Sequence, residues 1–400
     1  MTESELHSSR IELSGENLRS NIDFMQQLIG RERKLSFVVK GNAYGHGIRE
    51  MVPLAEKAGV NHFSVFSSDE AAAALEASRP ESEIMIMGYI ADEAMPWAMS
   101  NRISFYATCL ERLRAAAAAV KETGLEARVH LELETGFHRT GLRRDELPEA
   151  ASIIAGSGGK IKVEGTATHY AGAESIANYY RIQKQIQRYN DLCEYMVSLG
   201  MKTGIRHTAC SAAALTYPET RMDMVRTGIA LYGFWPTSET KMNYLLNYSC
   251  SGEDEDPSKA PSPLKRVMSW KTSVMSLHTV EPGNFVGYGN SCLTTVRSRF
   301  AAVPIGYSHG FSRDLSNCGY VLINGCRAAV SGVVNMNMLM ADVTEIPGVA
   351  RGDEVVIIGH QKNREITVSS FSALSQYLNY EVLVQIPKGI PRIPVEGDGE

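Results

Sequence analysis

The chain has 400 residues, of which 44% are hydrophobic and 21% are charged, and its formal net charge is -5. This length exceeds what one ordinary core requires, so the composition predicts a globular protein of two domains. The slightly negative charge argues against a basic surface for binding nucleic acids or membranes.

The N-terminal segment and the cysteines indicate the compartment in which the chain works. The N-terminus is polar, and no apolar run approaches the roughly 20 residues that cross a bilayer. The seven cysteines are scattered, without a CxxC pair. We therefore expect no metal site, no disulfide framework and a reducing, cytoplasmic location.

The first part of the chain alternates short apolar runs with helical stretches. The expected helices include Asp69–Ala77, Leu110–Lys121 and Ala173–Leu199. Eight runs have the character of strands: Leu35–Lys40, His62–Phe66, Ile84–Gly88, Ile103–Ala107, Arg128–Glu134, Lys162–Thr168, Ile205–Ala209 and Met224–Leu231. This alternation predicts an α/β fold, a (β/α)8 TIM-type barrel over residues 1–237. The alternative is an open doubly wound sheet, but the chain has no GxGxxG fingerprint.

The pattern changes after residue 237. Residues 238–265 are polar, contain the acidic run GEDED and end in PSKAPSP, which predicts an exposed acidic loop or insertion. Residues 266–400 contain the strand-like runs RVMSWKTSVMSLHTV, YVLINGCRAAVSGVV, EVVIIG and YEVLVQI. Asn324 and Gly325 predict a tight turn between two strands. The sequence therefore predicts a second, mostly β domain.

Reactive and ligand-binding residue types stand at the carboxyl ends of the barrel strands, where barrel enzymes carry their chemistry. They are Lys40, Arg139, His169, Ser211, Arg226, Gly228 and Ile229. Lys40 follows the apolar SFVV and precedes GNAYGHG. A desolvated amine has a lowered pKa and forms a Schiff base with an aldehyde, while nearby glycines allow a ligand to approach the backbone. The alternative for Lys40 is a surface amine at a strand terminus.

The stretch VVKGNAYGHG resembles the pyridoxal-phosphate lysine motif of the alanine racemase family. Further segments follow in that family's order: RVHLELETGFHRTGLR, ATHYA, MVRTGIALYG, GYGN, AAVPIGYSHGFSR and YEVLVQIPKGIPR. The resemblance covers nearly the whole chain. It implies a fold-type III pyridoxal-phosphate enzyme, with a (β/α)8 barrel, a C-terminal β domain and a head-to-tail homodimer.

The resemblance implies a pair of catalytic bases. Lys40 would carry pyridoxal 5'-phosphate as a Schiff base and serve as one base. Tyr288, in the β domain, would serve as the other base and come from the partner subunit. Two bases on opposite faces of the α-carbon are the simplest way to invert it. Ordinary β-sheet packing is the alternative for Tyr288.

The resemblance also implies the phosphate contacts. Tyr44 and Ser211 would bind the cofactor phosphate together with the backbone amides of Gly228 and Ile229. Arg139 would lie near the phenolic oxygen of the cofactor and beside the substrate. An N-cap for the following helix is the alternative role of Ser211, and it is compatible with phosphate binding.

Arg226 permits the sharpest chemical prediction. In the family an arginine faces the pyridine nitrogen of the cofactor, and His169 would contact both this arginine and Tyr288. Arginine has a pKa above about 12 and only donates hydrogen bonds, so the pyridine nitrogen should stay unprotonated. The weaker electron sink favours racemisation over transamination. A core histidine is the alternative for His169.

Some positions depart from the family's pattern. Glu132 stands where the family often has a carbamylated lysine, so we expect no carbamate here. The triplet Asn335-Met336-Asn337 replaces the usual Cys-Met-Asp, although the Met336 amide would still bind the substrate carboxylate. Lys388 replaces a tyrosine that helps to fix the phosphate. These positions surround the substrate, so they affect specificity more than reaction type.

We interpret the chain as an isomerase, a pyridoxal-phosphate-dependent amino-acid racemase that acts on a small amino acid. L- and D-alanine are the favoured pair, followed by serine or another small amino acid. A second hypothesis is a fold-type III enzyme diverted to decarboxylation or aldol-type chemistry, which Asn335, Asn337 and Lys388 leave open. A third is a non-catalytic carrier of the cofactor, and the second domain with Tyr288 argues against it.

Overall fold

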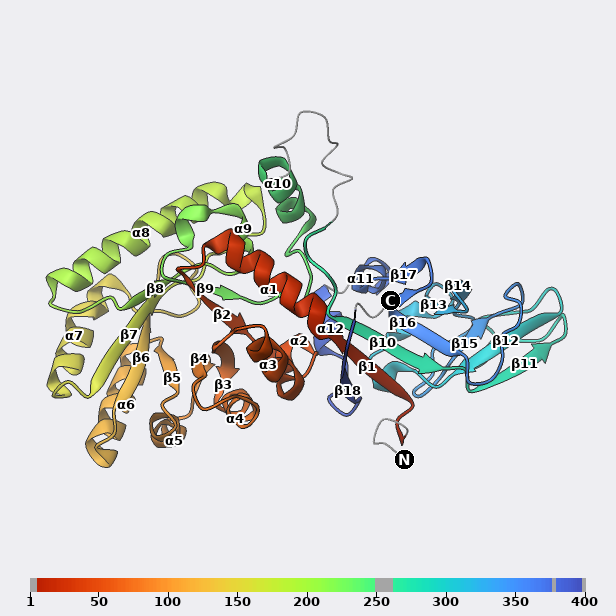
Figure 1. The fold of residues 1–400 in the computed structure, drawn as a ribbon, viewed down its shortest axis with the longest axis horizontal. Coiled ribbons are helices and arrows are strands. Elements are labelled where there is room, and N and C mark those ends of the chain that lie inside the picture. Colours follow the sequence, from red (N-terminus) through yellow and green to blue (C-terminus); the bar gives the residue numbers. More distant parts are fainter. Residues whose placement is uncertain (1–5, 249–261, 376–378, 398–400) are drawn as a thin grey trace. The chain divides into compact units, whose positions relative to one another are not determined.

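The computed structural model describes residues 6–248, 262–375 and 379–397. The chain divides into two compact units (Figure 1). We call residues 18–40 and 51–265 the barrel unit, and residues 1–17, 41–50 and 266–400 the β unit. None of the described helices combines the length and hydrophobicity needed to cross a membrane.

Eight parallel strands form the sheet of the barrel unit, in the order β8-β7-β6-β5-β4-β3-β2-β9. They are β2 (Lys34–Val38), β3 (His62–Ser67), β4 (Glu83–Tyr89), β5 (Ser104–Ala107), β6 (Ala127–Glu132), β7 (Ile161–Ala167), β8 (Ile205–His207) and β9 (Met224–Thr227). The two ends of the sheet meet where the amides of Asp223 and Arg226 donate to the carbonyls of Arg206 and Ala209, each at 3.0 Å. The predicted (β/α)8 barrel is therefore confirmed, and every predicted strand run overlaps one of its strands.

Figure 1 shows the helices around the outside of these strands. They are α1 (Gly15–Ile29), α3 (Ile48–Lys57), α4 (Ser68–Ala77), α5 (Met95–Ser100), α6 (Leu110–Thr123), α7 (Leu147–Gly156), α8 (Tyr179–Ser198), α9 (Ser211–Thr216) and α10 (Ser238–Tyr248). Because helices cover them outside and side chains fill the barrel inside, strands such as β2 are buried on both faces and read as continuous apolar runs. Inside the barrel, Met85, Tyr106, Ala167 and Met224 form a buried cluster.

Two sheets make up most of the β unit, which confirms the predicted mostly β C-terminal domain. The larger has the order β14-β13-β16-β10-β1-β18, with β17 paired to β16, and the smaller has the order β11-β12-β15. Their strands are β1 (Ser9–Ser14), β10 (Met268–Ser273), β11 (Ser276–Val280), β12 (Ser298–Val303), β13 (Tyr320–Ile323), β14 (Cys326–Ala329), β15 (Leu339–Asp342), β16 (Glu354–Gln361), β17 (Arg364–Ile366) and β18 (Arg392–Val395). Two helices, α11 (Val368–Ser375) and α12 (Asn379–Val384), complete the unit.

The N-terminal strand belongs to the β unit, although the sequence pattern placed residues 1–237 together. β1 pairs antiparallel with β10, with Ile11 opposite Trp270, and parallel with β18. Ile11 and Trp270 are both buried, so this pairing contributes to the core of the unit. The sequence of a strand does not identify a pairing partner more than 250 residues away, because its pattern reflects only the periodicity of the strand itself.

Local chemistry explains one confirmed turn and one wrong prediction. Asn324 (φ 54°) and Gly325 (φ 79°) join β13 to β14, since a two-residue hairpin turn of this kind needs positive φ at both positions. The run YEVLVQI, predicted as a strand, forms helix α12 instead. Val382 and Leu383 are adjacent and both buried, which fits one face of a helix, whereas the alternation of a strand would bury only one of two neighbours.

The expected loop over residues 238–265 begins with a helix. α10 takes up residues 238–248, and Ile176 donates its backbone amide to the Glu239 carboxylate at 3.0 Å. The acidic run GEDED falls within residues 249–261, which lie outside the described residues.

Candidate active site

Lys40 emerges at the carboxyl end of β2. Phe37, Val38 and Val39 immediately before it are buried, and the Val39 amide continues the strand pairing by donating to the Ser64 carbonyl at 2.8 Å. Although solvent reaches part of the Lys40 side chain, the protein atoms around it lower the pKa of the amine, and the Arg139 cation lowers it further. A lowered pKa increases the fraction of neutral, nucleophilic amine at neutral pH.

Six other predicted residues lie at the same rim of the barrel unit. Arg139 follows β6, His169 follows β7, Ser211 begins α9 after β8, Arg226 lies in β9, and Gly228 and Ile229 follow β9. The pKa of His169 indicates which of these groups lie close to it. The cations of Arg226, Arg139 and Lys40 lower the pKa of His169, after burial, to about 3. The barrel therefore gathers a neutral imidazole and three basic groups at one rim.

Arg226 donates hydrogen bonds through both of its terminal nitrogens. Its Nη2 donates to the carbonyls of Thr168 at 2.7 Å and Thr208 at 3.2 Å, and its Nη1 donates to the His207 carbonyl. Nη1 also lies 2.8 Å from Nδ1 of His207. The predicted imidazole partner, His169, makes no side-chain hydrogen bond to Arg226 among the described residues. β8 is the strand beside β9, so His207 is the histidine within reach.

The backbone after β9 forms a turn next to Ser211. The hydroxyl of Ser211 accepts a hydrogen bond from the Gly228 amide at 3.1 Å, and Ser211 is buried. The structure thus brings together Ser211 and Gly228, two of the residues predicted to bind phosphate. Ile229 follows directly in the same turn and is also buried.

Glu132 ends β6 as a buried carboxylate. Burial raises its pKa, while the Thr140 hydroxyl, which donates to Oε2 at 2.6 Å, and the Arg139 and Arg226 cations act in the opposite direction. Arg139 itself stacks over the Phe137 ring, with its guanidinium carbon 4.4 Å from the ring centroid. Glu132 therefore contributes a carboxyl group within the field of both arginines.

The segment after Lys40 adopts an unusual backbone within the β unit. Gly41, Asn42, Ala43 and Tyr44 have φ values of 64°, 54°, 53° and 50°, a left-handed turn in α2 (Lys40–Tyr44). Left-handed conformations cost roughly 1–2 kcal/mol for each residue with a side chain, so such strain persists only where surrounding contacts impose it.

Arg392 supplies part of that constraint. Its buried guanidinium donates to the Gly45 carbonyl at 2.9 Å and to the Pro387 carbonyl at 2.6 Å, which ties the segment after Tyr44 to the one that carries Lys388. Burial lowers the pKa of Arg392. The two segments therefore move together within the β unit.

Gly45 is expected to tolerate no side chain. Its φ is 81°, and an added Cβ would lie 2.0 Å from the carbonyl oxygen of Leu383. Gly283 is a matched control, because it also has a φ of 81° but nothing lies within 4 Å of an added Cβ. We expect Gly45→Ala to lower the free energy of unfolding by about 1–3 kcal/mol more than Gly283→Ala, as overpacking typically does. Urea titration of both variants measures the difference, and equal losses would contradict the steric argument.

The remaining predicted residues lie in loops of the β unit. Tyr288 is 71% exposed and stands between Gly287 and Gly289, both of positive φ, in the loop joining β11 to β12. Met336 is exposed, and its carbonyl accepts from the amide and the hydroxyl of Ser308. Within the described residues its amide makes no hydrogen bond, which leaves a donor available.

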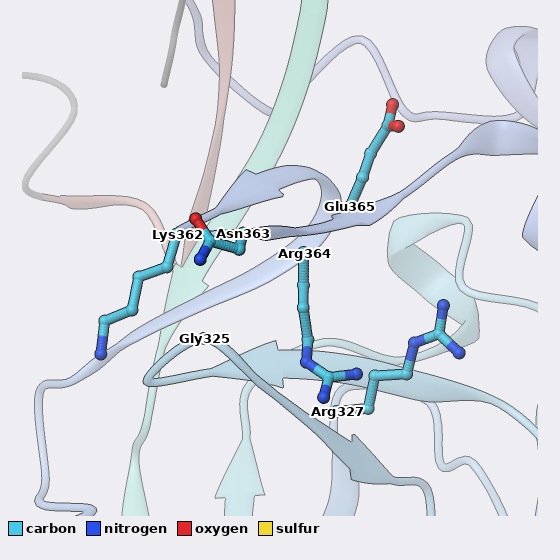
Figure 2. Close-up of a pocket in the computed structure, with 6 residues that line it drawn as sticks. All are labelled: Gly325, Arg327, Lys362, Asn363, Arg364 and Glu365. Carbon is cyan, nitrogen blue, oxygen red and sulfur yellow. The ribbon is translucent and has the colours of Figure 1, made fainter. Parts of the chain in front are cut away.

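Figure 2 shows a different pocket on the β unit, whose lining residues are Gly325, Arg327, Lys362, Asn363, Arg364 and Glu365. Their side chains point in different directions (Figure 2). Lys362 donates to the Asn324 carbonyl at 2.9 Å, and the Arg327 guanidinium lies over the Tyr320 ring at 4.6 Å. The pocket contains no predicted site residue.

The barrel with a nucleophilic lysine at its rim, followed by a β domain, defines a class of enzymes that act through a Schiff base. Comparison with known families agrees. Residues 13–236 match the model of the alanine racemase N-terminal domain, and residues 267–394 match that of the alanine racemase C-terminal domain. The chain belongs to the alanine racemase family. It is an isomerase of the racemase class, and the family depends on pyridoxal phosphate.

Individual relatives match over nearly their whole length. The alanine racemase of Leptospira interrogans is 32% identical over 391 residues, which cover 98% of this chain and 96% of that protein. The alanine racemase structure from Clostridium difficile 630 has a TM-score of 0.86 and 29% identity, covering 98% of this chain and 97% of its own. The alanine racemase from Bacillus anthracis with bound L-Ala-P has a TM-score of 0.86 and 26% identity, covering 98% and 96%.

Sequence reasoning missed two histidines at this site. His207 accepts from Arg226, and His130 lies 2.8 Å from His207. The signal that could have marked them is their place within barrel strands, because a buried polar side chain at an inward position needs a partner inside the barrel.

Proposed function

We propose that this protein interconverts L- and D-alanine with pyridoxal 5'-phosphate bound at the barrel rim. The observation that carries the proposal is that two groups lie at the same rim of the barrel. Lys40 has a lowered pKa, and Arg226 is a buried arginine whose guanidinium is a hydrogen-bond donor. Family membership supports the reaction class. Serine and other small amino acids are the competing substrates.

The groups at the rim fit an anionic aldehyde with a ring nitrogen. Lys40 offers an amine for a Schiff base. The Ser211 hydroxyl accepts from the Gly228 amide and keeps its own proton to donate, and we assign it, with the backbone of Gly228 and Ile229, to the phosphate. We assign Tyr44 and His169 to the same cofactor site. Bound pyridoxal phosphate supplies an electron sink that acidifies the α-proton of an amino acid.

Arg226 determines how strong that sink is. A guanidinium keeps its protons at any physiological pH, so it donates to a ring nitrogen and does not protonate it. His207 and the Thr168 carbonyl accept hydrogen bonds from the guanidinium and hold its orientation. A weaker sink favours rapid return of a proton to the α-carbon, which is what racemisation requires.

Lys40 and Tyr288 then move the protons. One removes the α-proton while the conjugate acid of the other protonates the opposite face. We assign the substrate carboxylate to Arg139 and to the Met336 amide, whose hydrogen is available. In this assignment Asn335, Asn337 and Lys388 influence which side chain the site accepts.

We propose a homodimer in which Tyr288 serves the partner's barrel. Support comes from the Tyr288 loop, where Phe285, Leu293 and Val296 are each exposed by about half or more. Apolar side chains gathered on one exposed loop are typical of a protein–protein interface. A cytoplasmic location is part of the same proposal, and six described cysteines that form no disulfide support it.

Incubation with a single enantiomer in deuterated water tests the reaction. L-alanine should yield D-alanine that carries deuterium at the α-carbon, and D-alanine should yield the deuterated L form, as chiral chromatography with mass spectrometry will show. Release of carbon dioxide, or formation of an aldehyde, would instead support the diverted chemistries. Inversion of serine without inversion of alanine would reassign the substrate and keep the reaction.

A further inference from the structure

A row of hydrogen-bonded side chains runs into the barrel from Arg226. Nη1 of Arg226 lies 2.8 Å from Nδ1 of His207, and Nε2 of His207 lies 2.8 Å from Nδ1 of His130. Arg226, His207 and His130 are all buried. Tyr106 packs against both imidazoles, with ring centroids 6.2 Å from His130 and 5.9 Å from His207. The row therefore joins three strands, β9, β8 and β6, through side chains alone.

The chemistry of the three groups fixes the direction of every hydrogen bond. A guanidinium has no acceptor, so Nδ1 of His207 must accept and the single proton of a neutral His207 must sit on Nε2. That proton points at Nδ1 of His130, which must therefore accept, and His130 carries its own proton on Nε2. Burial keeps both rings neutral: it lowers the pKa of His130 to about 3 and that of His207 well below its usual value.

The backbone of β7 leaves room for this arrangement. The register between β6 and β7 shifts between Val129 and His130, which sets His130 opposite Gly165. A Cβ added to Gly165 would lie 2.7 Å from Nδ1 of His130, the atom that faces His207. A register shift of this kind re-aims a side chain within a sheet. The irregularity and the glycine together place the His130 ring where it meets His207.

We propose that His130 is a positioning residue for Arg226. By accepting from His207, it holds His207 in the tautomer whose Nδ1 accepts from Arg226, and so it keeps the guanidinium in one orientation. Without this acceptor the Nε2 proton of His207 is buried without a partner, which favours the tautomer protonated on Nδ1. That proton would face the guanidinium as a second donor and displace it. The inference rests on the proposed function for its catalytic consequence, but not for its structural content.

The catalytic consequence concerns the fate of the α-proton. A displaced Arg226 no longer donates steadily to the ring nitrogen, so the electron sink becomes stronger. We then expect more of the misdirected reaction, in which the amino group of alanine stays on the cofactor and hydrolysis releases pyruvate. Racemisation should fall at the same time, since the two outcomes compete for one proton transfer.

The first test uses the wild-type protein without cofactor. Nitrogen-15 chemical shifts of labelled histidines, assigned with a His207→Asn variant, report which ring nitrogen of His207 carries the proton. We expect a neutral ring protonated on Nε2. A proton on Nδ1, or a charged ring, would overturn the inference without any variant of His130.

The second test compares His130→Asn with His130→Leu, two side chains of similar size. Asparagine can present its Oδ1 as an acceptor near the position of Nδ1, whereas leucine cannot. In the cofactor-free protein, His130→Leu should yield a mixture of His207 tautomers and His130→Asn should retain the wild-type form. In the loaded enzyme, the ratio of pyruvate formed to alanine racemised should rise about tenfold in His130→Leu, which corresponds to the loss of one buried hydrogen-bond acceptor.

The two readouts separate the possible failures. A His207 tautomer that is unchanged in His130→Leu would overturn the inference, and so would an equal product ratio in both variants. A wild-type enzyme that leaves alanine unchanged would overturn the proposed function, while the nitrogen-15 measurement would still decide the role of His130. Thermal unfolding of both variants shows whether His130→Leu is folded. If His130→Leu is unfolded, the tautomer of His207 in the wild-type protein decides whether the inference holds.

Discussion

Replacing Lys40 with alanine is expected to abolish covalent capture of pyridoxal phosphate and to slow racemisation at least 10²–10⁴-fold, the range typical of losing a general base. Lys40 lies at the carboxyl end of β2. Burial of its amine by surrounding protein atoms, together with the Arg139 cation, lowers its pKa, so more of the amine is neutral and able to form a Schiff base. The variant loses both the Schiff-base partner of the cofactor and one base. Addition of methylamine should restore part of the activity, because a small amine can enter the space of the missing side chain.

Borohydride reduction followed by peptide mass spectrometry locates the attachment directly. Lys34 is the matched control, since it begins the same strand but pairs with Glu83 at 2.8 Å. We expect the cofactor mass on Lys40 and none on Lys34, and Lys34→Ala should keep the cofactor. Attachment at any other lysine would remove Lys40 from the mechanism.

Tyr288→Phe should reduce net racemisation by roughly 10²–10⁴-fold in both directions, because both faces of the α-carbon need a proton carrier. The phenolic hydroxyl is the only group removed, and the side chain is largely exposed, so stability should change little. Exchange of the α-proton with deuterated water should persist for the one enantiomer whose proton faces Lys40. Retained exchange without inversion distinguishes a missing second base from a damaged site.

The same variant tests whether the site is shared. Mixing Lys40→Ala chains with Tyr288→Phe chains forms heterodimers that hold one intact pair, Lys40 from one chain and Tyr288 from the other. Random reassociation of a symmetric dimer should restore about a quarter of the wild-type activity. Each variant alone serves as the control. Absence of recovery in a mixture proven to contain heterodimers would place both bases in one chain.

The amino-acid sequence is sufficient to predict the barrel and its reactive end. Parallel strands buried on both faces read as continuous apolar runs, so β2 through β9 could be found from local pattern. The carboxyl ends of such strands lie at one face of the barrel, so Lys40, Ser211 and Arg226 could be assigned to one site before any contact between them was known. The Asn324-Gly325 turn is equally local, since it follows from the conformations those residues allow.

The partners of these residues were not predictable in the same way. His169 was expected to contact Arg226, and the charge of Arg226 does lower the pKa of His169, but the imidazole that accepts a hydrogen bond from Arg226 is His207, which lies on the neighbouring strand. Helix α12 replaced an expected strand, since packing of Leu383 outweighed the β propensity of its valines. Apart from Gly41, the sequence does not predict the left-handed turn after Lys40, because tertiary contacts such as those of Arg392 with Gly45 impose it.

The sequence by itself indicated most of the elements, the candidate attachment lysine Lys40 and the family. The tertiary structure alone decided that β1 joins the β unit, that a register shift sets His130 opposite Gly165, and that the protons of His207 and His130 point away from Arg226. The physical reason is that periodicity and turn chemistry act between neighbours in the chain. A hydrogen bond between strands depends instead on register, and register is settled only when the barrel closes.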